Sequence, residues 1–317
     1  MYLGIDISKD RLDCHKLNGE YGEVKEFKNN RKGIKALVKW SADCQQVVME
    51  ATGVYWQSCA FAIHEVGIAV SVVNPSRVKN FARMNLVRGK TDKMDAKLIA
   101  EFAQMVKPDH WQPPTDKDQE LKIIVRERDS LVKELTRLTN QKHAHDHRKG
   151  SSSSVQECLN ERIKLLKSQI KRFEKEIKLL CQEEFPEAYQ VIRSLPGIGP
   201  VTSSVLLSET QGLKHFHDAK QLTAYTGIAP APHESGNTKH RSPISKTGNK
   251  RIRKAFYLAT LKAAKHPAFK EFYQRILKRS NSTKLARIAL ARKLLVIAFT
   301  LVKSNQHFDP DFRKTTT

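Results

Sequence analysis

The chain has 317 residues, of which 39% are hydrophobic, and this length predicts two or three globular domains. Its 56 lysines and arginines outnumber its 33 aspartates and glutamates, so the formal net charge is +23, as is typical of nucleic-acid-binding, ribosomal or membrane-surface proteins. Residues 294–302 form an apolar run about half as long as the ~18 to 20 residues that span a bilayer, which argues against a membrane protein and predicts a buried helix. The charged N-terminus shows no signal-peptide pattern, so we expect a cytoplasmic location.

The cysteines give no sign of a disulfide framework or a zinc site. They are five in number, scattered, and never arranged as C-x-x-C. We expect reduced thiols that mostly pack in the interior: Cys14, Cys44, Cys59, Cys158 and Cys181.

Residues 1–102 alternate short β-rich runs with helical patterns. In chain order they predict β-β-β-α-β-α-β-α, an α/β domain with a mixed sheet. Two prolines in HWQPPTD (residues 110–116) cannot continue a helix, so the first domain is predicted to be residues 1–115.

Residues 116–185 are charged and helical in pattern, with a flexible KGSSSSV segment at 149–155. The second half carries apolar residues spaced alternately four and three apart, which predicts a coiled-coil seam made of Leu159, Ile163, Leu166, Ile170, Phe173, Ile177 and Leu180. The first half is a weaker version that Arg128 interrupts. The two halves could pair as a helical hairpin or contact another subunit, and we favour the subunit contact.

Residues 186–317 are predicted to form a mainly α-helical domain, helical to about Asn305. Its first signature, SLPGIGPVTSSVLL (194–207), is similar to a helix-hairpin-helix motif, in which backbone N–H groups around Gly197 and Gly199 would hold a phosphate. An ordinary packing corner between two helices is the alternative.

The second signature, HESGNTKHRSPISKTGNKRIRK (233–254), is basic. Its cations are predicted to contact nucleic-acid phosphates, with a solvated basic surface as the alternative: Lys239, Arg241, Lys246, Lys250, Arg251, Arg253 and Lys254. Ser235 and Ser245 are both candidate nucleophiles, and composition alone does not separate them.

Four acids stand out against this positive charge. Asp92 and Asp95 are three residues apart and would share one side of a helix, although acids at a helix start capped by Thr91 are the alternative. Asp6 lies inside the apolar first strand, and Glu50 ends the fourth strand. Asp10 and Asp13 compete with Asp6 but lie in a more polar stretch.

These acids predict a metal site. Carboxylates brought together raise one another's pKa unless cations lie between them. Oxygen ligands without a Cys or His cluster favour Mg²⁺ or Mn²⁺, and two such ions ~3.5 to 4 Å apart can clamp a phosphodiester during displacement. Nucleic acid is then both partner and substrate.

Taken together, the motifs resemble the DEDD transposases of the IS-one-ten insertion-sequence family, which act as bridge-RNA-guided DNA recombinases. The resemblance covers nearly the whole chain and rests on an ordered set of motifs: GIDISK, MEATGVY, VVNPSRVKNFA, KTDKMDAKLIAEF, LPGIGPVTSSVLL, QLTAYTGIAP, HESG and ISKTGNKRIRKA.

The resemblance implies a RuvC-like N-terminal domain of the ribonuclease H fold, in which Asp6, Glu50, Asp92 and Asp95 bind metal. It implies that Ser235, rather than Ser245, is the catalytic serine of a C-terminal transposase domain. Ser235 would attack the scissile phosphate, and a hydroxyl of another strand would later resolve the phosphoserine link without ATP. Whether His233 acts as a base stays open.

The resemblance also implies partners: donor and target DNA, a noncoding bridge RNA, and further copies of the chain in a dimer or tetramer. We then expect a bacterial or archaeal protein at the nucleoid. Two alternatives remain, a RuvC-type nuclease that hydrolyses DNA junctions with water, and a non-catalytic nucleic-acid-binding protein.

Overall fold

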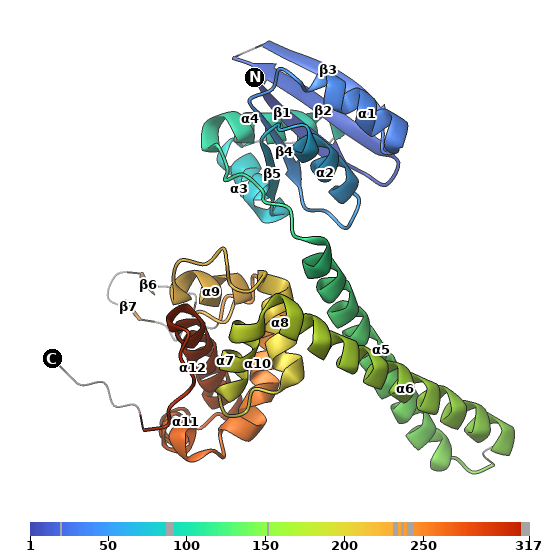
Figure 1. Ribbon diagram of the computed structural model, residues 1–317, viewed down its shortest axis with the longest axis vertical. Helices are drawn as coiled ribbons and strands as arrows, with labels where there is room; N and C mark the ends of the chain where they lie inside the picture. The colour runs from blue at the N-terminus through green and yellow to red at the C-terminus, as the bar shows by residue number, and fades with distance from the viewer. Residues whose placement is uncertain are drawn as a thin grey trace. The chain divides into compact units, whose positions relative to one another are not determined.

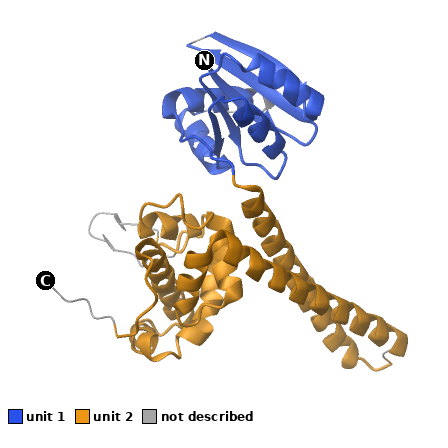
Figure 2. Ribbon diagram, viewed as in Figure 1, with its two compact units in different colours: residues 1–113 blue, residues 114–317 orange. Residues whose placement is uncertain are grey.

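The computed structural model describes residues 1–19, 21–86, 92–150, 152–230, 234–235, 238–239 and 244–311. Side chains are not described at positions 92, 93, 234, 235, 238 and 239. The chain divides into two compact units, residues 1–113 and 114–317 (Figure 2). The division falls between two prolines, Pro113 and Pro114, inside the HWQPPTD segment.

Unit 1 contains a mixed sheet in the strand order β3-β2-β1-β4-β5, in which β1 pairs antiparallel with β2 and parallel with β4 (Figure 1). The predicted mixed sheet is therefore confirmed. The elements are β1 (Tyr2–Ile7), β2 (Arg11–Asn18), β3 (Tyr21–Lys28), α1 (Arg31–Trp40), β4 (Gln46–Glu50), α2 (Gln57–Glu65), β5 (Val70–Val73), α3 (Pro75–Met84) and α4 (Asp92–Val106).

The last helical stretch of unit 1 differs from the expectation of one helix through Phe102. The structure has two helices there, because α3 ends at its C-cap Asn85 and Leu86 then takes a positive φ of 53°. An α-helix cannot continue through such a residue. The separate helix α4 is the element that carries Asp92 and Asp95.

Alternation along β1 gives the sheet two different faces. Leu3, Ile5 and Ile7 belong to one buried cluster, together with apolar residues of α1 and α2. The other face holds a second cluster, to which α4 contributes Ile99 and Phe102. Helices therefore cover both faces of the sheet, as expected for an α/β domain.

Unit 2 is mainly helical (Figure 1). Its elements are α5 (Asp116–Asp146), α6 (Ser153–Glu184), α7 (Pro186–Ser194), α8 (Pro200–Thr210), α9 (Ala219–Thr226), β6 (Glu234–Ser235), β7 (Thr238–Lys239), α10 (Lys250–Ala263), α11 (Pro267–Ser280) and α12 (Thr283–Ser304).

The two long helices α5 and α6 pack against each other along the chain's own hairpin. Leu159 and Leu166 of the predicted seam form a buried cluster with Leu138 of α5. Arg128, which looked like an interruption, forms an ion pair with Glu174 of α6. The structure therefore shows the alternative in which α5 and α6 pair as a helical hairpin. Contact with another subunit, which we favoured from the sequence, is not what buries the seam.

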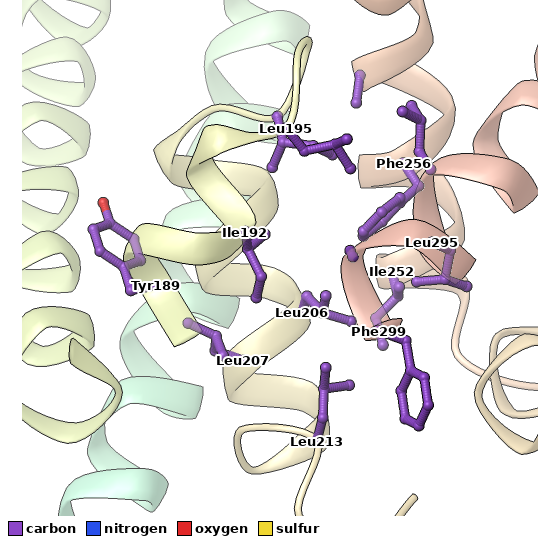
Figure 3. Close-up of a cluster of buried hydrophobic side chains, with 14 of the residues drawn as sticks. Tyr189, Ile192, Leu195, Leu206, Leu207, Leu213, Ile252, Phe256, Leu295 and Phe299 are labelled. Carbon is purple, nitrogen blue, oxygen red and sulfur yellow. The ribbon is translucent and has the colours of Figure 1, made fainter. Parts of the chain in front are cut away.

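Helices α7, α8, α10 and α12 surround the main core of unit 2. Figure 3 shows Ile192 and Leu206 facing Phe256 and Leu295 in this core. The apolar run of residues 294–302 lies in α12, so the predicted buried helix is confirmed. None of the helices in the described residues has the length and apolar character that crossing a membrane requires.

The cysteines agree with the sequence-based expectation. All five are free, and each of them except Cys158 is buried.

Candidate active site

Asp6 and Glu50 lie on neighbouring parallel strands. In the register of β1 and β4, Ile5 pairs with Met49, so the next residues along the two strands are Asp6 and Glu50. Neighbouring strands are ~4.8 Å apart, which brings these two positions side by side at the carboxyl ends of their strands. Because side chains alternate along a strand, both carboxylates point to the face opposite Ile5 and Met49.

Helix α4 covers the face to which Asp6 points. Gly4 shares that face, and a Cβ at this glycine would lie 2.3 Å from both the Ala96 carbonyl oxygen and the Ala100 amide nitrogen. No side chain fits in this space, so glycine at position 4 lets the backbone of α4 lie directly on β1. Gly4 is a functional position that we did not predict from the sequence, although a glycine inside a strand can mark a close backbone approach.

The contact at Gly4 orients the acid-bearing start of α4. Asp92 is the first residue of the helix, one turn before Ala96 on the same side, and Asp95 is partly buried. Tyr2, at the beginning of β1, packs on the cluster that includes Phe102 from later in α4. This arrangement indicates that α4 runs antiparallel to β1, so its first turn lies toward the carboxyl end of β1.

The complete four-acid site lies partly outside the described side chains. Those that are described contain no group of three or more His, Cys, Asp or Glu residues that could hold a metal ion. The side chain of Asp92 is not among them, and neither is Thr91, the alternative helix cap. The four-acid metal site therefore stays a prediction.

Asp13 is the cross-strand neighbour of Asp6. The two residues pair in the register of β1 and β2, and Asp13 is buried. Arg11 Nε donates to Asp13 Oδ2 at 2.9 Å, which gives Asp13 a counter-charge from the protein itself. Asp10 is exposed between the two strands. Asp13 thus has a cationic partner on its own strand, and the choice of Asp6 as the first-strand ligand stays a prediction.

The donor set fits a hard divalent cation. Asp6, Glu50 and Asp95 offer carboxylate oxygens, which are the ligands that Mg²⁺ and Mn²⁺ prefer. Two of these acids come from strand ends at a set separation, and the third comes from a helix held against the strand backbone at Gly4. Ligands that arrive from rigid elements keep their geometry better than ligands from loops.

Ser235 belongs to a short hairpin in unit 2. The strands β6 and β7 pair antiparallel, with Ser235 opposite Thr238. Nearer the base, Pro230 forms a bridge with Ile244. We define the stem of this hairpin as residues 225–230 together with residues 244–249, and the stem is described in full.

Two glycines bring the halves of the stem together. A Cβ at Gly248, whose φ is +130°, would lie 2.2 Å from the Tyr225 carbonyl oxygen. A Cβ at Gly227, whose φ is +66°, would lie 2.5 Å from the Thr247 carbonyl oxygen. Both positions therefore require glycine, for backbone conformation and for space.

A buried residue of α8, Glu209, contacts both halves of the stem, one through its carboxylate and the other through its backbone carbonyl. Asn249 Nδ2 donates to Glu209 Oε2 at 2.9 Å, and the Tyr225 hydroxyl donates to the Glu209 carbonyl oxygen at 3.1 Å. Arg126 of α5 donates to both carboxylate oxygens, at 2.9 and 3.0 Å. The Glu209 side chain is only 2% exposed. We call these four residues the Glu209 cluster, which we did not predict from the sequence.

Several cations keep Glu209 ionised. Burial would raise the pKa of its carboxyl, but the hydrogen bonds and charge of Arg126, with Asn249 and Lys122, lower that pKa below its usual value. Burial also lowers the pKa of Lys122, with Arg126 and Arg251 acting in the same direction. One carboxylate thus serves as counter-charge to three cations.

The predicted basic contacts differ in their surroundings. Three have partners inside unit 2, namely Arg251 (3.8 Å from Glu209 Oε1), Arg253 (2.6 Å from the Thr226 carbonyl oxygen) and Lys254 (3.2 Å from Asp129 Oδ1). Lys246 and Lys250 are exposed. His233, Arg241 and the side chains of Ser235 and Lys239 lie outside the described residues.

The predicted helix-hairpin-helix turn packs against α10. Gly197 has a φ of +90°, and a Cβ there would lie 2.7 Å from Ala263 Cβ and 2.8 Å from the Ala259 carbonyl oxygen. This gives Gly197 a packing role, as in the ordinary-corner alternative. Gly199 has open space at its Cβ position and is the N-cap of α8, so phosphate contact there stays a prediction.

Two family models match the chain. A DEDD transposase model of the IS110 type, the family written IS-one-ten above, matches residues 3–145, which include the four acids. A model described as "Transposase IS116/IS110/IS902 family" matches residues 189–274, which include Ser235.

Curated relatives extend this similarity along the chain. The pilin gene-inverting protein of Moraxella bovis is 30% identical over 97% of both chains. The transposase for insertion sequence element IS1111A of Coxiella burnetii is 27% identical over 79% of this chain and 74% of its own length. The transposase for insertion sequence element IS1328 of Yersinia enterocolitica is 26% identical over 80% of each chain. Because one of these relatives spans nearly the whole chain and the two family models follow each other in order, the chain belongs to the IS110 family of DEDD transposases, enzymes that cut and rejoin DNA.

Proposed function

We propose that the chain is the transposase of an insertion sequence in which Asp6, Glu50, Asp92 and Asp95 bind two divalent ions and Ser235 is the nucleophile. The observation that carries this proposal is the register of β1 and β4, which aligns Asp6 with Glu50 beside the helix that begins at Asp92. Like charges so close raise each other's pKa unless cations lie between them. A metal site is therefore the natural use of this arrangement.

The proposed reaction has two steps. Mg²⁺ or Mn²⁺, when bound, would neutralise the acids and polarise the scissile phosphate. Ser235 Oγ loses its proton and attacks phosphorus, the bond from phosphorus to the leaving oxygen breaks, and that oxygen takes up a proton. A hydroxyl of another strand later attacks the phosphoserine and releases Ser235. The phosphodiester energy is kept in the serine link, so no ATP is required.

Recombination is better supported than simple hydrolysis. The Moraxella bovis relative is named for inverting a pilin gene, and inversion requires rejoining as well as cutting. That relative is 30% identical along 97% of both chains. A RuvC-type nuclease that uses water would account for the acids but would leave Ser235 without a role.

We also propose the finer domain assignments. The mixed sheet of unit 1, in which three antiparallel strands are followed by parallel β4 and β5, supports a RuvC-like ribonuclease H fold for residues 1–115. The α5–α6 hairpin would be the coiled-coil region of residues 116–185, followed by the serine-bearing transposase domain of residues 186–317.

We propose that a noncoding bridge RNA selects donor and target DNA, and that the enzyme works as a dimer or tetramer. A net charge of +23 and the exposed Lys246 and Lys250 favour binding of more than one polyanion. Expression together with the flanking element should yield a discrete RNA that copurifies with the protein. Purification free of any discrete RNA would contradict the RNA-guided step.

The serine chemistry can be tested by trapping the covalent intermediate. The full-length protein is incubated with Mg²⁺, its RNA and labelled DNA, and detergent-resistant protein–DNA adducts are measured. Wild type should form the adduct and Ser235→Ala should not. Ser245→Ala is the matched control, because Ser245 lies in the stem of the same hairpin and its side chain is exposed. Asp95→Asn should remove adduct and cleavage together.

Two outcomes would support the alternatives instead. Cleavage by Ser235→Ala at the wild-type rate would favour the hydrolytic nuclease. Nucleic-acid binding that is indifferent to Mg²⁺, with no activity for Asp95→Asn to remove, would favour a non-catalytic binding protein.

A further inference from the structure

We propose that Glu209 is a positioning residue for the reaction, because it holds the stem of the serine-bearing hairpin against α5 and α8. The inference rests on the proposed function, in which Ser235 is the nucleophile. Glu209 itself lies 26 positions before Ser235 in the chain and is buried, so its effect must act through the stem.

The contacts of Glu209 reach both halves of the stem. The Glu209 carboxylate accepts a hydrogen bond from the Asn249 side chain, just before α10 begins. The Glu209 backbone carbonyl oxygen accepts a hydrogen bond from the Tyr225 hydroxyl, near the end of α9. Arg126 ties the same carboxylate to α5 through two hydrogen bonds. Charge-assisted, two-point bonds of this kind define direction as well as distance. Hydrogen bonds to Glu209 of α8, which Arg126 of α5 holds in turn, therefore orient the stem in addition to apolar packing.

Orientation of the stem matters because the chain passes from the stem to Ser235 and back. Ser235 lies ten positions after Tyr225 in the chain, and an extended chain of that length reaches at most ~33 Å. Over half that distance, a rotation of a few degrees corresponds to a displacement of ~1 Å. A displacement of ~1 Å at a reacting atom lowers the rate on the order of 100-fold.

The stem itself should survive a change at Glu209. Arg253 donates to the Thr226 carbonyl oxygen at 2.6 Å, and Asn249 N donates to the Tyr225 carbonyl oxygen at 2.7 Å. Gly227 and Gly248 keep the two halves in close contact. Loss of the Glu209 carboxylate would therefore shift the stem as a unit. It would also leave Lys122, Arg126 and Arg251 without their shared counter-charge.

The test measures the rate of adduct formation by full-length Glu209→Gln under single-turnover conditions. We expect the rate to fall ~10- to 100-fold while the affinity for the RNA and DNA stays within ~2-fold, since no nucleic-acid contact is removed. Tyr225→Phe is a milder variant that keeps the carboxylate and removes the two hydrogen bonds of the Tyr225 hydroxyl, which donates to the Glu209 backbone carbonyl and accepts from Asn249 Nδ2 at 3.4 Å. It should slow adduct formation ~3- to 10-fold, and it keeps the test decisive if Glu209→Gln folds poorly.

A complementary change should restore the rate. In Glu209→Gln with Asn249→Asp, the new amide can donate to the new carboxylate, and one negative charge remains beside Arg126. The carboxylate that Asn249→Asp introduces can still cap α10, because the side-chain oxygen of Asn249 already accepts from Arg251 N and Ile252 N. We expect the double variant to react faster than either single variant. A purely structural role for Glu209 would instead leave the adduct rate of the folded protein unchanged in all of these variants and would change only their stability.

Glu174→Gln is the matched control, because it removes another Arg–Glu pair of unit 2, to Arg128, without touching the stem. It should change stability and leave the adduct rate of the folded protein unchanged.

The positioning role is wrong if Glu209→Gln or Tyr225→Phe reacts at the wild-type rate, or if the double variant is no faster than Glu209→Gln. Adduct formation by Ser235→Ala would instead refute the proposed function, so the two failures are distinguishable.

Discussion

Replacing Gly4 with alanine should push α4 away from the sheet. The added Cβ would lie 2.3 Å from the Ala96 carbonyl oxygen and the Ala100 amide nitrogen, whereas ordinary contacts begin near 3.4 Å. Both neighbours are backbone atoms of a helical turn, so neither can rotate aside as a side chain would. The helix must then move by about 1 Å, and the acids at its start must move with it.

The expected magnitude follows from the nature of the clash. Overpacking a core with one carbon costs ~1 to 3 kcal/mol, and contact with rigid backbone favours the upper end of that range. A shift of ~1 Å in two of the four acids should lower the rate on the order of 100-fold. Unit 1 should therefore lose stability, and the folded enzyme should also lose activity.

Tryptophan fluorescence measures the stability of unit 1 selectively, because Trp40, Trp56 and Trp111 all lie in that unit. Urea unfolding followed by this signal gives the change in free energy, and Mg²⁺-dependent adduct formation gives the change in activity. Gly67→Ala is the matched control, since its Cβ would meet nothing within 4 Å and its φ of +82° limits the cost to ~1 to 2 kcal/mol of backbone strain. Wild-type stability and activity in Gly4→Ala would refute the role we give this glycine.

Two further predictions concern titration and thiol exposure. The pKa of Glu209 in the folded protein is lowered from its ordinary value, chiefly by Arg126 against the effect of burial, so the ionised carboxylate stabilises unit 2 at pH values above its unfolded-state pKa, and this contribution is lost as pH falls through the folded-state pKa. Unfolding free energies of wild type and Glu209→Gln should therefore differ near neutral pH and converge in acid; a constant difference would contradict this. Cys158 is the exposed thiol, and burial raises the pKa of Cys59 to about 12. A thiol reagent should thus modify one thiol quickly in the native protein, and Cys158→Ser should abolish that phase; several fast thiols would contradict the described burial.

Local patterns predicted much of unit 1. Alternation in the first strand and its single acid are properties of neighbouring residues, and they correctly indicated a strand with Asp6 inside it. Gly4 was not recognised, because the reason for that glycine is the backbone of α4, almost a hundred residues away in the chain. The end of α3 was also missed, since a positive φ at Leu86 has no signature in a leucine.

Patterns in unit 2 predicted burial better than they predicted partners. The apolar seam of α6 was correctly identified as a contact surface, but an apolar stripe does not say which helix will cover it. The useful signal was Arg128, whose charge is matched by Glu174 across the hairpin. The Glu209 cluster left no local pattern, because Arg126 and Glu209 are 83 residues apart.

The α5–α6 hairpin has a consequence for how the chain folds. Its contacts join residues close in sequence, so it can form before the rest of unit 2. Once Arg128 has met Glu174, the remaining chain path from Arg126 to Glu209 is about half as long, which lowers the entropy lost on closing that loop by ~0.6 kcal/mol. The hairpin is then an early folding unit that brings the two ends of a distant ion pair within reach of each other.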